Sequence, residues 1–403
     1  MKSYKRKPKA PRTFDDIEVE WNEIKAKGEN TYTQYKKRKS RGGYRTISVP
    51  SDSLKKLQKD LNYKLSFMKL EHPFALGFRK NKNIANNALA HRVKPENAFK
   101  WRGDYIQGRK HVFADVTKCT STEIRYYAPK SGVNLDVKDA FGSVTVKLMQ
   151  EALHEYDRFS PHQIDLMIEI GMHQGKLPQG APTSPLLLNV AMFMFDTYVT
   201  HMIRKKLGEP SNAKFVYTRF ADDITITSDK YEFAKKTIGF VAKALTRYGF
   251  ELNNKKTHVM SLKSGMFVTG INIVNSYTHV STSRRSRDKV KSAIYQLSEK
   301  SVEDPDYKEA HARVMGRIGY ILSTDFVHGG KLIEQAIAAR IISGRSKFRG
   351  MRASSIMIQS LQQRERRYEV FKQKYEHDYN NNNNEKDQQN IQTNPGQRLG
   401  SIF

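Results

Sequence analysis

Two adjacent carboxylates, Asp222 and Asp223, stand in the stretch YTRFADDITITS, which covers residues 217 to 228. An aromatic-rich segment before the pair and alternating Ile and Thr after it predict two strands joined by a tight turn. Like charges this close repel each other, so the pair needs a cation unless it only satisfies turn backbone. A further carboxylate, Asp136, ends the apolar strand predicted within NLDVKDAF. If that strand pairs with the hairpin, three carboxylates converge.

Three converging carboxylates suit hard divalent cations with oxygen ligands, and Mg²⁺ suits phosphate chemistry. Two such ions can activate a 3′-oxygen and stabilise a leaving pyrophosphate. We therefore predict a centre of two Mg²⁺ ions for nucleotidyl transfer, with Asp136, Asp222 and Asp223 as the catalytic carboxylates. The alternative is a turn whose aspartates only bond to nearby backbone.

A second motif, LPQGAPTSP at residues 177 to 185, precedes a long apolar segment. Its Gly and Pro residues predict a tight loop whose backbone is exposed, and such a loop can approach a nucleotide or template without side-chain clash. An ordinary loop at the entry of a helix explains the motif equally well when it is taken alone.

The charge of the chain indicates a polyanionic partner. The 403 residues carry a formal net charge of +29, which makes nucleic acid the first candidate and an anionic membrane surface a weaker one. Cys119 is the only cysteine, so a disulfide framework or a thiolate metal cluster is excluded. The basic N-terminus lacks the apolar stretch of a secretory signal, and no run reaches the length of a membrane span. These features predict a soluble protein of a reducing compartment, without a membrane partner.

The elements that must position the carboxylates fall into a mixed α/β (α+β) body followed by a helical appendage. Strand and helix patterns intermingle over residues 31–275, except for a polar, turn-rich insert at about 95–130 that predicts a hairpin or long loop. Residues 1–30 predict a basic arm and a helix. Residues 276–350 are helical in pattern, and residues 351–403 predict a charged helix and a disordered Asn/Gln-rich tail.

Periodicity and capping residues predict the individual elements of this body. A basic hairpin with a Gly-Gly turn is expected within residues 35 to 50. Helices are expected near residues 14–27, after the capping residue Ser51, from Ile84, at 146–155, at 161–171, after the 177–185 loop and at about 230–248.

Together the motifs resemble those of reverse transcriptases, in the order of that family and over about residues 35 to 345. Asp136–Phe141 resembles the first polymerase motif, Gln179-Gly180 with Ser184-Pro185 the second, Phe220–Asp223 the third and Gly249–Thr257 the one that follows. The resemblance implies an RNA-directed DNA polymerase shaped like a right hand. Its fingers and palm would span residues 31–275, and its helical thumb residues 276–350.

The resemblance also implies roles around the carboxylates. Asp136 and Asp222 would hold both metal ions, the Val137 carbonyl would help, and Asp223 would support them.

Five further residues would bind the nucleotide. Phe141 would exclude a ribose 2′-OH, although such a residue is often core packing. Gln179 and Gly180 would contact the incoming nucleotide and the template. Arg45 would meet the triphosphate and Lys256 the leaving pyrophosphate, unless both are simply solvated charges.

Within the family the chain looks most like bacterial retron reverse transcriptases. Asn87–His91 resembles their N-A-x-x-H motif, Val268-Thr269-Gly270 their V-T-G motif, and SRRSRDKVKSAIYQL from Ser283 the start of their thumb. We expect RNA-binding residues in these segments: Asn87, His91, Val268, Thr269, Gly270, Arg284, Arg285, Arg287, Lys289 and Lys291.

The resemblance implies a bacterial cytoplasmic enzyme that copies part of a cognate noncoding RNA into cDNA from dNTPs. Retron enzymes prime from an RNA 2′-OH and serve antiphage defence beside a separate effector protein. The segment between His91 and Asp136 and the tail beyond Gly350 are longer than in typical retron enzymes. They keep open another bacterial defence reverse transcriptase with its own noncoding RNA. A catalytically silent RNA-binding scaffold is the third alternative, which the intact spacing of the aspartates disfavours.

Overall fold

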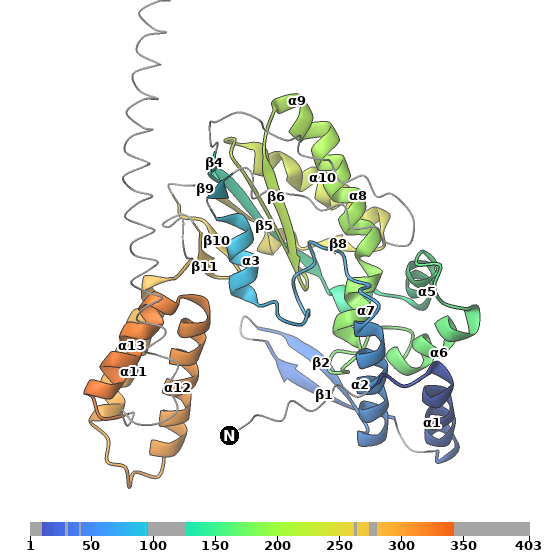
Figure 1. The fold of residues 1–403 in the computed structure, drawn as a ribbon, viewed down its shortest axis with the longest axis horizontal. Helices are drawn as coiled ribbons and strands as arrows, with labels where there is room; N and C mark the ends of the chain where they lie inside the picture. Colours follow the sequence, from blue (N-terminus) through green and yellow to red (C-terminus); the bar gives the residue numbers. More distant parts are fainter. Residues whose placement is uncertain are drawn as a thin grey trace, which may run out of the picture. The chain divides into compact units, whose positions relative to one another are not determined.

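Figure 1 shows a computed structural model of the protein. The chain forms two compact units, Met1–Val274 and Asn275–Phe403. Strands and helices intermingle in the first unit, which confirms the predicted mixed α/β class. The described part of the second unit holds a short strand, β12 (Ser281–Thr282), and then helices only. The structure describes residues 10–28, 31–39, 42–92, 94–95, 126–261, 264–273 and 280–341.

An antiparallel sheet forms the centre of the first unit. Its strands lie in the order β6, β7, β5, β8, and β9 also pairs with β5. The strands are β5 (Ser131–Lys138), β6 (Phe215–Phe220), β7 (Asp223–Ser228), β8 (Glu251–Leu252) and β9 (His258–Ser261).

Strict alternation along the strands separates the two faces of this sheet. Ile224 and Ile226 of β7 face the same way as Leu135 and Val133, their partners on β5, and all four are buried in the main core. The polar residues between them face the other way, where Thr225 donates to the Asn134 Oδ1 atom at 2.9 Å. Asp136 and Asp223 belong to this polar face by the same alternation.

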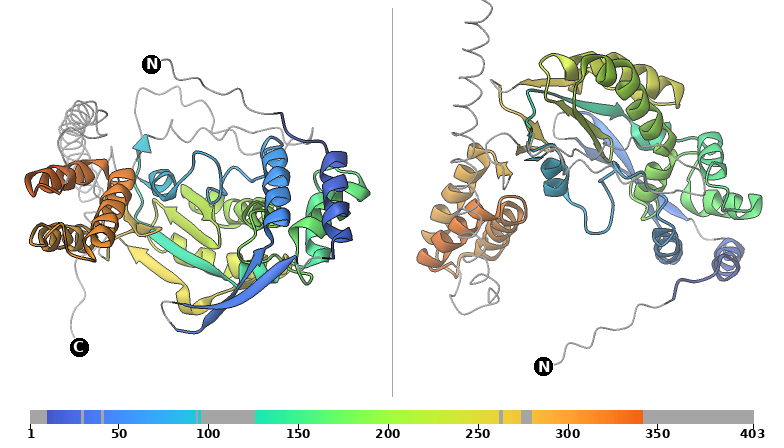
Figure 2. Two further views of the ribbon diagram at one scale, coloured as in Figure 1. Left: turned by 90° about the horizontal axis from the view of Figure 1, so that it is seen from below. Right: turned by 45° about the horizontal axis from the view of Figure 1, so that its top comes forward.

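Helices cover both faces of the sheet. Helix α10 (Phe233–Arg247) packs on β5, β7 and α8 (Phe193–Ile203), whereas α3 (Ile84–His91) packs on β6. Both arrangements can be followed in Figures 1 and 2.

The N-terminal elements follow the predicted pattern closely. Helix α1 (Phe14–Ala26) starts at a Thr13 capping box, and α2 (Asp52–Ser66) is capped by the Ser51 side chain. Between them β1 (Tyr32–Arg38) pairs with β2 (Tyr44–Pro50) as the expected basic hairpin. Helices α5 (Val146–His154) and α6 (Pro161–Gly171) also lie where periodicity placed them, and α10 is slightly shorter than predicted.

The long apolar helix expected after the 177–185 loop is instead broken. It consists of α7 (Ser184–Ala191), α8, a π-helical turn and α9 (Glu209–Ser211), with the first break at Met192. Among the described residues no single helix could span a membrane, although α7 together with Phe193–Ser211, bent by 41°, has the length and composition to do so. The break lets α7 and α8 each present one polar side chain to the same buried arginine, described below.

The predicted insert at about 95–130 is described only at its base. There β3 (Lys94–Pro95) pairs antiparallel with β4 (Tyr126–Tyr127). Residues 96–125 lie outside the described part, as do residues 1–9 of the predicted basic arm and the charged helix and Asn/Gln-rich tail predicted for residues 351–403.

The second unit contains three helices within its described residues. They are α11 (Arg284–Ser298), α12 (Tyr307–Thr324) and α13 (Phe326–Ala338). The three pack around a separate apolar core that includes Val290, Ile318 and Ile333. The helical pattern predicted for this region is therefore present as far as Ala338.

Candidate active site

The register of β5 and β7 brings the predicted carboxylates together. Asp136 lies directly opposite Asp223, and the hairpin between β6 and β7 has Ala221 and Asp222 as its two central residues. The Val137 backbone N–H donates to the Asp222 carbonyl at 3.0 Å, which ties the end of β5 to the turn. The expected pairing of the two strands is thus present, and it makes the three aspartates neighbours.

Burial and the like charges of their neighbours raise the pKa of Asp222 and Asp223 in this cluster. Burial, the first cause, and the negative charge of Asp136 raise the pKa of Asp222, while Lys256 and Arg45 act against this rise. Asp223 keeps access to solvent, but partial burial together with the charges of Asp222 and Asp136 raises its pKa to about 6. Carboxylates that are hard to ionise together gain from a bound cation, so this donor set fits hard divalent metal ions.

The cation nearest to Asp136 in the structure is Lys256. Its Nζ atom lies 2.8 Å from the Asp136 Oδ2 atom, and the Asn253 amide donates to the Oδ1 atom at 2.8 Å. Both residues belong to the segment that follows β8, with Lys256 closing the short 3₁₀ helix Asn254–Lys256. Within the described part of the chain, no three His, Cys, Asp or Glu side chains are placed to hold a metal ion. The Lys256 ammonium thus pairs with a carboxylate that the predicted metal site would also use.

The predicted nucleotide-binding residues surround the carboxylates on separate elements. Arg45 is exposed on β2, opposite Lys37, and its positive charge acts to lower the pKa of Asp222. Phe141 lies in the short helix α4 (Ala140–Ser143), half-buried against the core. Its ring centroid is 6.3 Å from that of Phe78, whose side chain is exposed. The position suits both the steric role and the packing role expected for Phe141.

The 177–185 loop is joined to β2 through backbone. The Ser48 N–H donates to the Gln179 carbonyl at 2.9 Å. Gly180 has φ +130°, and a Cβ atom there would lie 2.7 Å from the Ser48 carbonyl oxygen. Only glycine fits such a close approach. The loop therefore holds the strand that bears Arg45, while the Gln179 side chain reaches to 3.5 Å from Asp139.

Asn87 and His91 are buried rather than placed on an RNA-binding surface. Both have 0% exposed area. The two His91 ring nitrogens lie 2.8 Å from the Thr227 hydroxyl and 2.7 Å from the Thr218 hydroxyl, which itself donates to Asn87. Because a fully buried side chain cannot touch RNA without moving, we correct the expectation for both residues. They fasten α3 to the hairpin that carries Asp222 and Asp223.

We expect His91→Ala to lower the free energy of unfolding by about 3 kcal/mol, because it removes two buried hydrogen bonds, to Thr218 and Thr227, and opens a cavity. RNA affinity of the folded variant should be unchanged. Thermal unfolding and RNA titration measure the two quantities. His201, exposed on α8, gives the control His201→Ala, with a cost below about 0.5 kcal/mol. If His91→Ala keeps its stability but binds RNA more weakly, His91 contacts RNA directly and this correction is wrong.

Only part of the V-T-G motif is accessible to solvent. Val268 is buried, whereas Thr269 and Gly270 form the two-residue turn between β10 (Phe267–Val268) and β11 (Ile271–Asn272). Both turn residues have positive φ, 47° and 81°. Thr269 also donates to the Ile84 carbonyl at 3.4 Å, so the accessible part of the motif is the turn that adjoins α3.

The predicted basic cluster at the start of α11 divides into two kinds of residue. Arg284, Arg285, Lys289 and Lys291 are exposed. The Arg287 side chain is only 20% exposed, because it donates to the Thr282 carbonyl and lies 3.8 Å from the buried Asp325. Arg287 therefore connects the start of α11 to Thr282 and Asp325 within the second unit. We remove it from the expected RNA-binding set.

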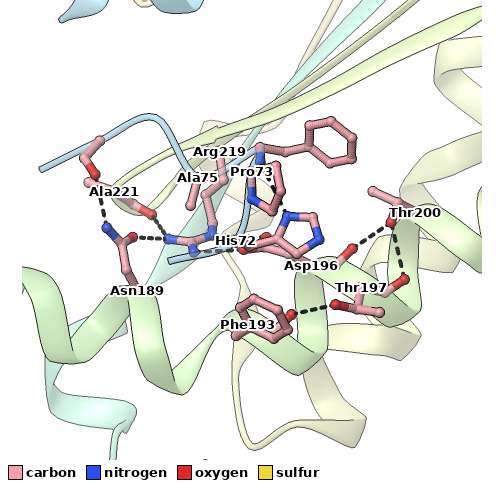
Figure 3. A network of polar contacts seen from close by, with 12 residues as sticks. His72, Pro73, Ala75, Asn189, Phe193, Asp196, Thr197, Thr200, Arg219 and Ala221 are labelled. Carbon is pink, nitrogen blue, oxygen red and sulfur yellow. Dashed lines mark hydrogen bonds and ion pairs between the residues drawn. The ribbon is translucent and has the colours of Figure 1, made fainter. Parts of the chain in front are cut away.

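A buried polar network beneath the Asp222 turn was not anticipated from the sequence. It joins Arg219 to Asp196 and Asn189 (Figure 3). Asn189 in turn donates to the Gly77 carbonyl. The available signal was the presence of Asn189 and Asp196 inside the apolar run LLLNVAMFMFD. Polar residues in a buried helix face require partners, and an arginine two residues before the turn can supply them.

Comparisons with known proteins place the chain in a family. The model described as "Reverse transcriptase (RNA-dependent DNA polymerase)" matches residues 35–273. Curated relatives include the Retron Ec73 reverse transcriptase of Escherichia coli, 27% identical over 299 residues, which cover 71% of this chain and 81% of that protein. The Retron Ec86 reverse transcriptase of the same organism is 26% identical over 295 residues, with 72% and 74% covered. These relatives confirm the likeness to retron reverse transcriptases.

Among solved structures, telomerase from Candida albicans in complex with a fragment of telomeric RNA aligns at 10% identity with a TM-score of 0.40. The alignment covers 79% of this chain, which spans 61% of that one, and a likeness at this level identifies no shared site. The family match, by contrast, covers more than half of the chain and includes all three aspartates. The chain belongs to the reverse transcriptase family and is an RNA-directed DNA polymerase.

Proposed function

We propose that this enzyme copies part of a structured noncoding RNA into DNA by two-metal nucleotidyl transfer, within a retron antiphage defence system. The observation that carries the chemical part is the strand register that sets Asp136 opposite Asp223 and beside Asp222. The retron reverse transcriptases among its relatives support the biological part.

The three aspartates would hold two Mg²⁺ ions, with help from the Val137 carbonyl. When bound, the ions would activate a 3′-hydroxyl and stabilise the leaving pyrophosphate. Lys256, released from Asp136, would remain close enough to neutralise the pyrophosphate. Arg45 would meet the triphosphate, because its charge already acts on Asp222 from β2.

Substrate positioning would fall to the residues around the 177–185 loop. Gly180 allows the loop backbone to lie against β2, so Gln179 and Gly180 would contact the nucleotide and the template. The Phe141 ring would lie under the sugar and exclude a 2′-OH.

The division of the chain after Val274 supports a right-hand arrangement. The hairpin of β1 and β2 would belong to the fingers, the central sheet to the palm, and the helices α11 to α13 to the thumb. The cognate RNA would serve as template and primer, and dNTPs as substrates, with a separate protein as effector.

Sequencing the nucleic acid that copurifies with the protein tests the partner. A single structured noncoding RNA joined to cDNA complementary to part of it is the expected result. An RNA with unlinked cDNA would favour a different defence reverse transcriptase. RNA without any cDNA would favour a silent scaffold.

The exposed basic residues of α11 should bind RNA phosphates. We expect the substitution of Arg284, Arg285, Lys289 and Lys291 by Gln to weaken cognate RNA binding. The slope of log K against log salt concentration should become shallower by up to about three, since fewer counterions are released. Gel-shift titrations at several salt concentrations measure both effects.

A variant of equal charge change serves as the control. Lys230, Lys235, Lys236 and Lys243 are exposed lysines on or beside α10. Their replacement by Gln should leave the affinity and the slope closer to wild type. Equal effects of the two variants would show that net charge alone, and not α11, attracts the RNA.

A further inference from the structure

The turn that presents Asp222 is strained. It has two central residues, of which Ala221 has φ +62°. Positive φ at the first central residue is the pattern of a type II′ hairpin turn, where glycine is usual. Alanine disfavours this conformation by about fivefold to thirtyfold relative to glycine. Something in the surrounding structure must therefore hold the turn in place.

Arg219 holds this turn from within the core. It is fully buried, and its Nη1 atom donates to the Ala221 carbonyl at 3.0 Å. The guanidinium also forms a fork with the Asp196 carboxylate of α8, at 2.7–3.1 Å, and donates to the Asn189 Oδ1 atom of α7 at 3.0 Å. Figure 3 shows Arg219 between these partners. Asp196 and Asn189 thus fix the orientation of the planar guanidinium, which donates to the Ala221 carbonyl.

The same network holds the turn from its other side. The Asn189 amide donates to the Gly77 carbonyl at 2.9 Å, and the Leu76 N–H donates to the Arg219 carbonyl at 2.7 Å. Gly77 approaches so closely that a Cβ atom there would lie 2.3 Å from the Ala221 nitrogen. Ala221 therefore lies between the Gly77 backbone and the Arg219 guanidinium.

Stability alone does not account for such a network. A buried ion pair loses the hydration of both charges, and well-packed apolar residues of similar volume are often at least as stable. The network fixes the geometry of one peptide group, and that group precedes the two aspartates of the turn.

We propose that Asn189 and Arg219 are positioning residues that lock the strained Ala221 turn and so keep Asp222 and Asp223 in the arrangement that binds metal ions. This role rests on the proposed function of the two aspartates. Without the lock, Ala221 relaxes from positive φ and the carboxylates lose their register with Asp136.

The variant Asn189→Ala tests this role, because it keeps the ion pair but frees Gly77 and loosens Arg219. We expect kcat for dNTP incorporation to fall between about tenfold and a hundredfold, with little change in KM. The dissociation constant for Mn²⁺, followed by electron paramagnetic resonance without nucleotide, should rise at least about threefold, because small shifts of the carboxylates already misplace the ion. Thermal unfolding of each variant gives its stability.

Tyr217→Phe is the matched control. It removes another buried hydrogen bond of the network, from the Tyr217 hydroxyl to Asp196 at 2.6 Å, and none to Ala221. We expect a loss of stability similar to that of Asn189→Ala, with kcat and Mn²⁺ binding near wild type. If the control reduces both as strongly as Asn189→Ala, the network is merely structural.

Adding Ala221→Gly supplies a rescue that a structural role does not predict. Glycine adopts positive φ without penalty, so the double variant should regain part of the lost Mn²⁺ affinity and kcat. If the double variant is as stable as Asn189→Ala but regains neither Mn²⁺ affinity nor kcat, the proposal is overturned. If Asn189→Ala does not fold, Gly77→Ala replaces it, because its Cβ displaces the Ala221 backbone without removing a side-chain hydrogen bond of the network, and retained activity there overturns the proposal. Failure of the proposed function is distinguishable, since wild type itself would then neither bind Mn²⁺ nor incorporate dNTPs.

Discussion

Replacing Asp222 and Asp223 together, by Ala or by Asn, should reduce dNTP incorporation by at least about a thousandfold. Asp223 lies opposite Asp136 at one end of the central strands, and Asp222 lies in the adjoining turn, so the double variant would leave only one of the three aspartates proposed to hold the metal ions. RNA affinity should remain within about twofold of wild type, since binding draws on basic residues elsewhere. Primer extension with Mg²⁺ measures the first quantity, and gel shifts measure the second.

The Asn form is the sharper variant because it keeps the shape of both side chains. It also removes the burial of charge and the mutual repulsion that raise the pKa of both aspartates, so thermal stability should not fall. Glu251→Gln provides the control, since it removes an exposed carboxylate of the same sheet, whose ion-pair partner among the described residues is Lys138. Appreciable activity in the double variant would refute the two-metal assignment.

Phe141→Val should shift the choice between ribonucleotides and deoxyribonucleotides by about a hundredfold. A ring under the sugar leaves no room for a 2′-OH, and the smaller side chain opens that space. The ratio of kcat/KM for rNTP and dNTP, measured on one template and primer, reports the change.

Phe159→Val separates selectivity from packing. Phe159 is another half-buried phenylalanine, packed edge-on against Phe14 of α1. Phe159→Val should lose about as much stability as Phe141→Val, and its ratio of kcat/KM for rNTP and dNTP should stay at the wild-type value. An unchanged ratio in Phe141→Val would assign Phe141 to the core alone.

The sequence predicted those parts of the fold that local patterns determine. Alternating Ile and Thr predicted β7, apolar character predicted the strand that ends at Asp136, and the Ser51 cap predicted the start of α2. Strand pairing followed from the chemistry that the carboxylates would need, which is why Asp136 and Asp223 could be expected to meet.

Contacts between distant segments could not be predicted in the same way. Nothing in the local sequence shows that His91 is buried between Thr218 and Thr227, or that Arg287 turns back to Asp325. Both were expected among the RNA-binding residues, because a burial partner far along the chain leaves no periodic signal. Arg219 was overlooked for the same reason, since its partners Asn189 and Asp196 lie in what appeared to be one apolar helix.

The most direct measurement is DNA synthesis by the purified protein on the RNA that accompanies it. Labelled dNTPs are added with Mg²⁺, and the products are sequenced after RNase treatment. The proposed function predicts labelled DNA complementary to one segment of that RNA, and none from Asp222→Asn/Asp223→Asn. RNA that copurifies while no DNA forms, with either Mg²⁺ or Mn²⁺, would contradict it.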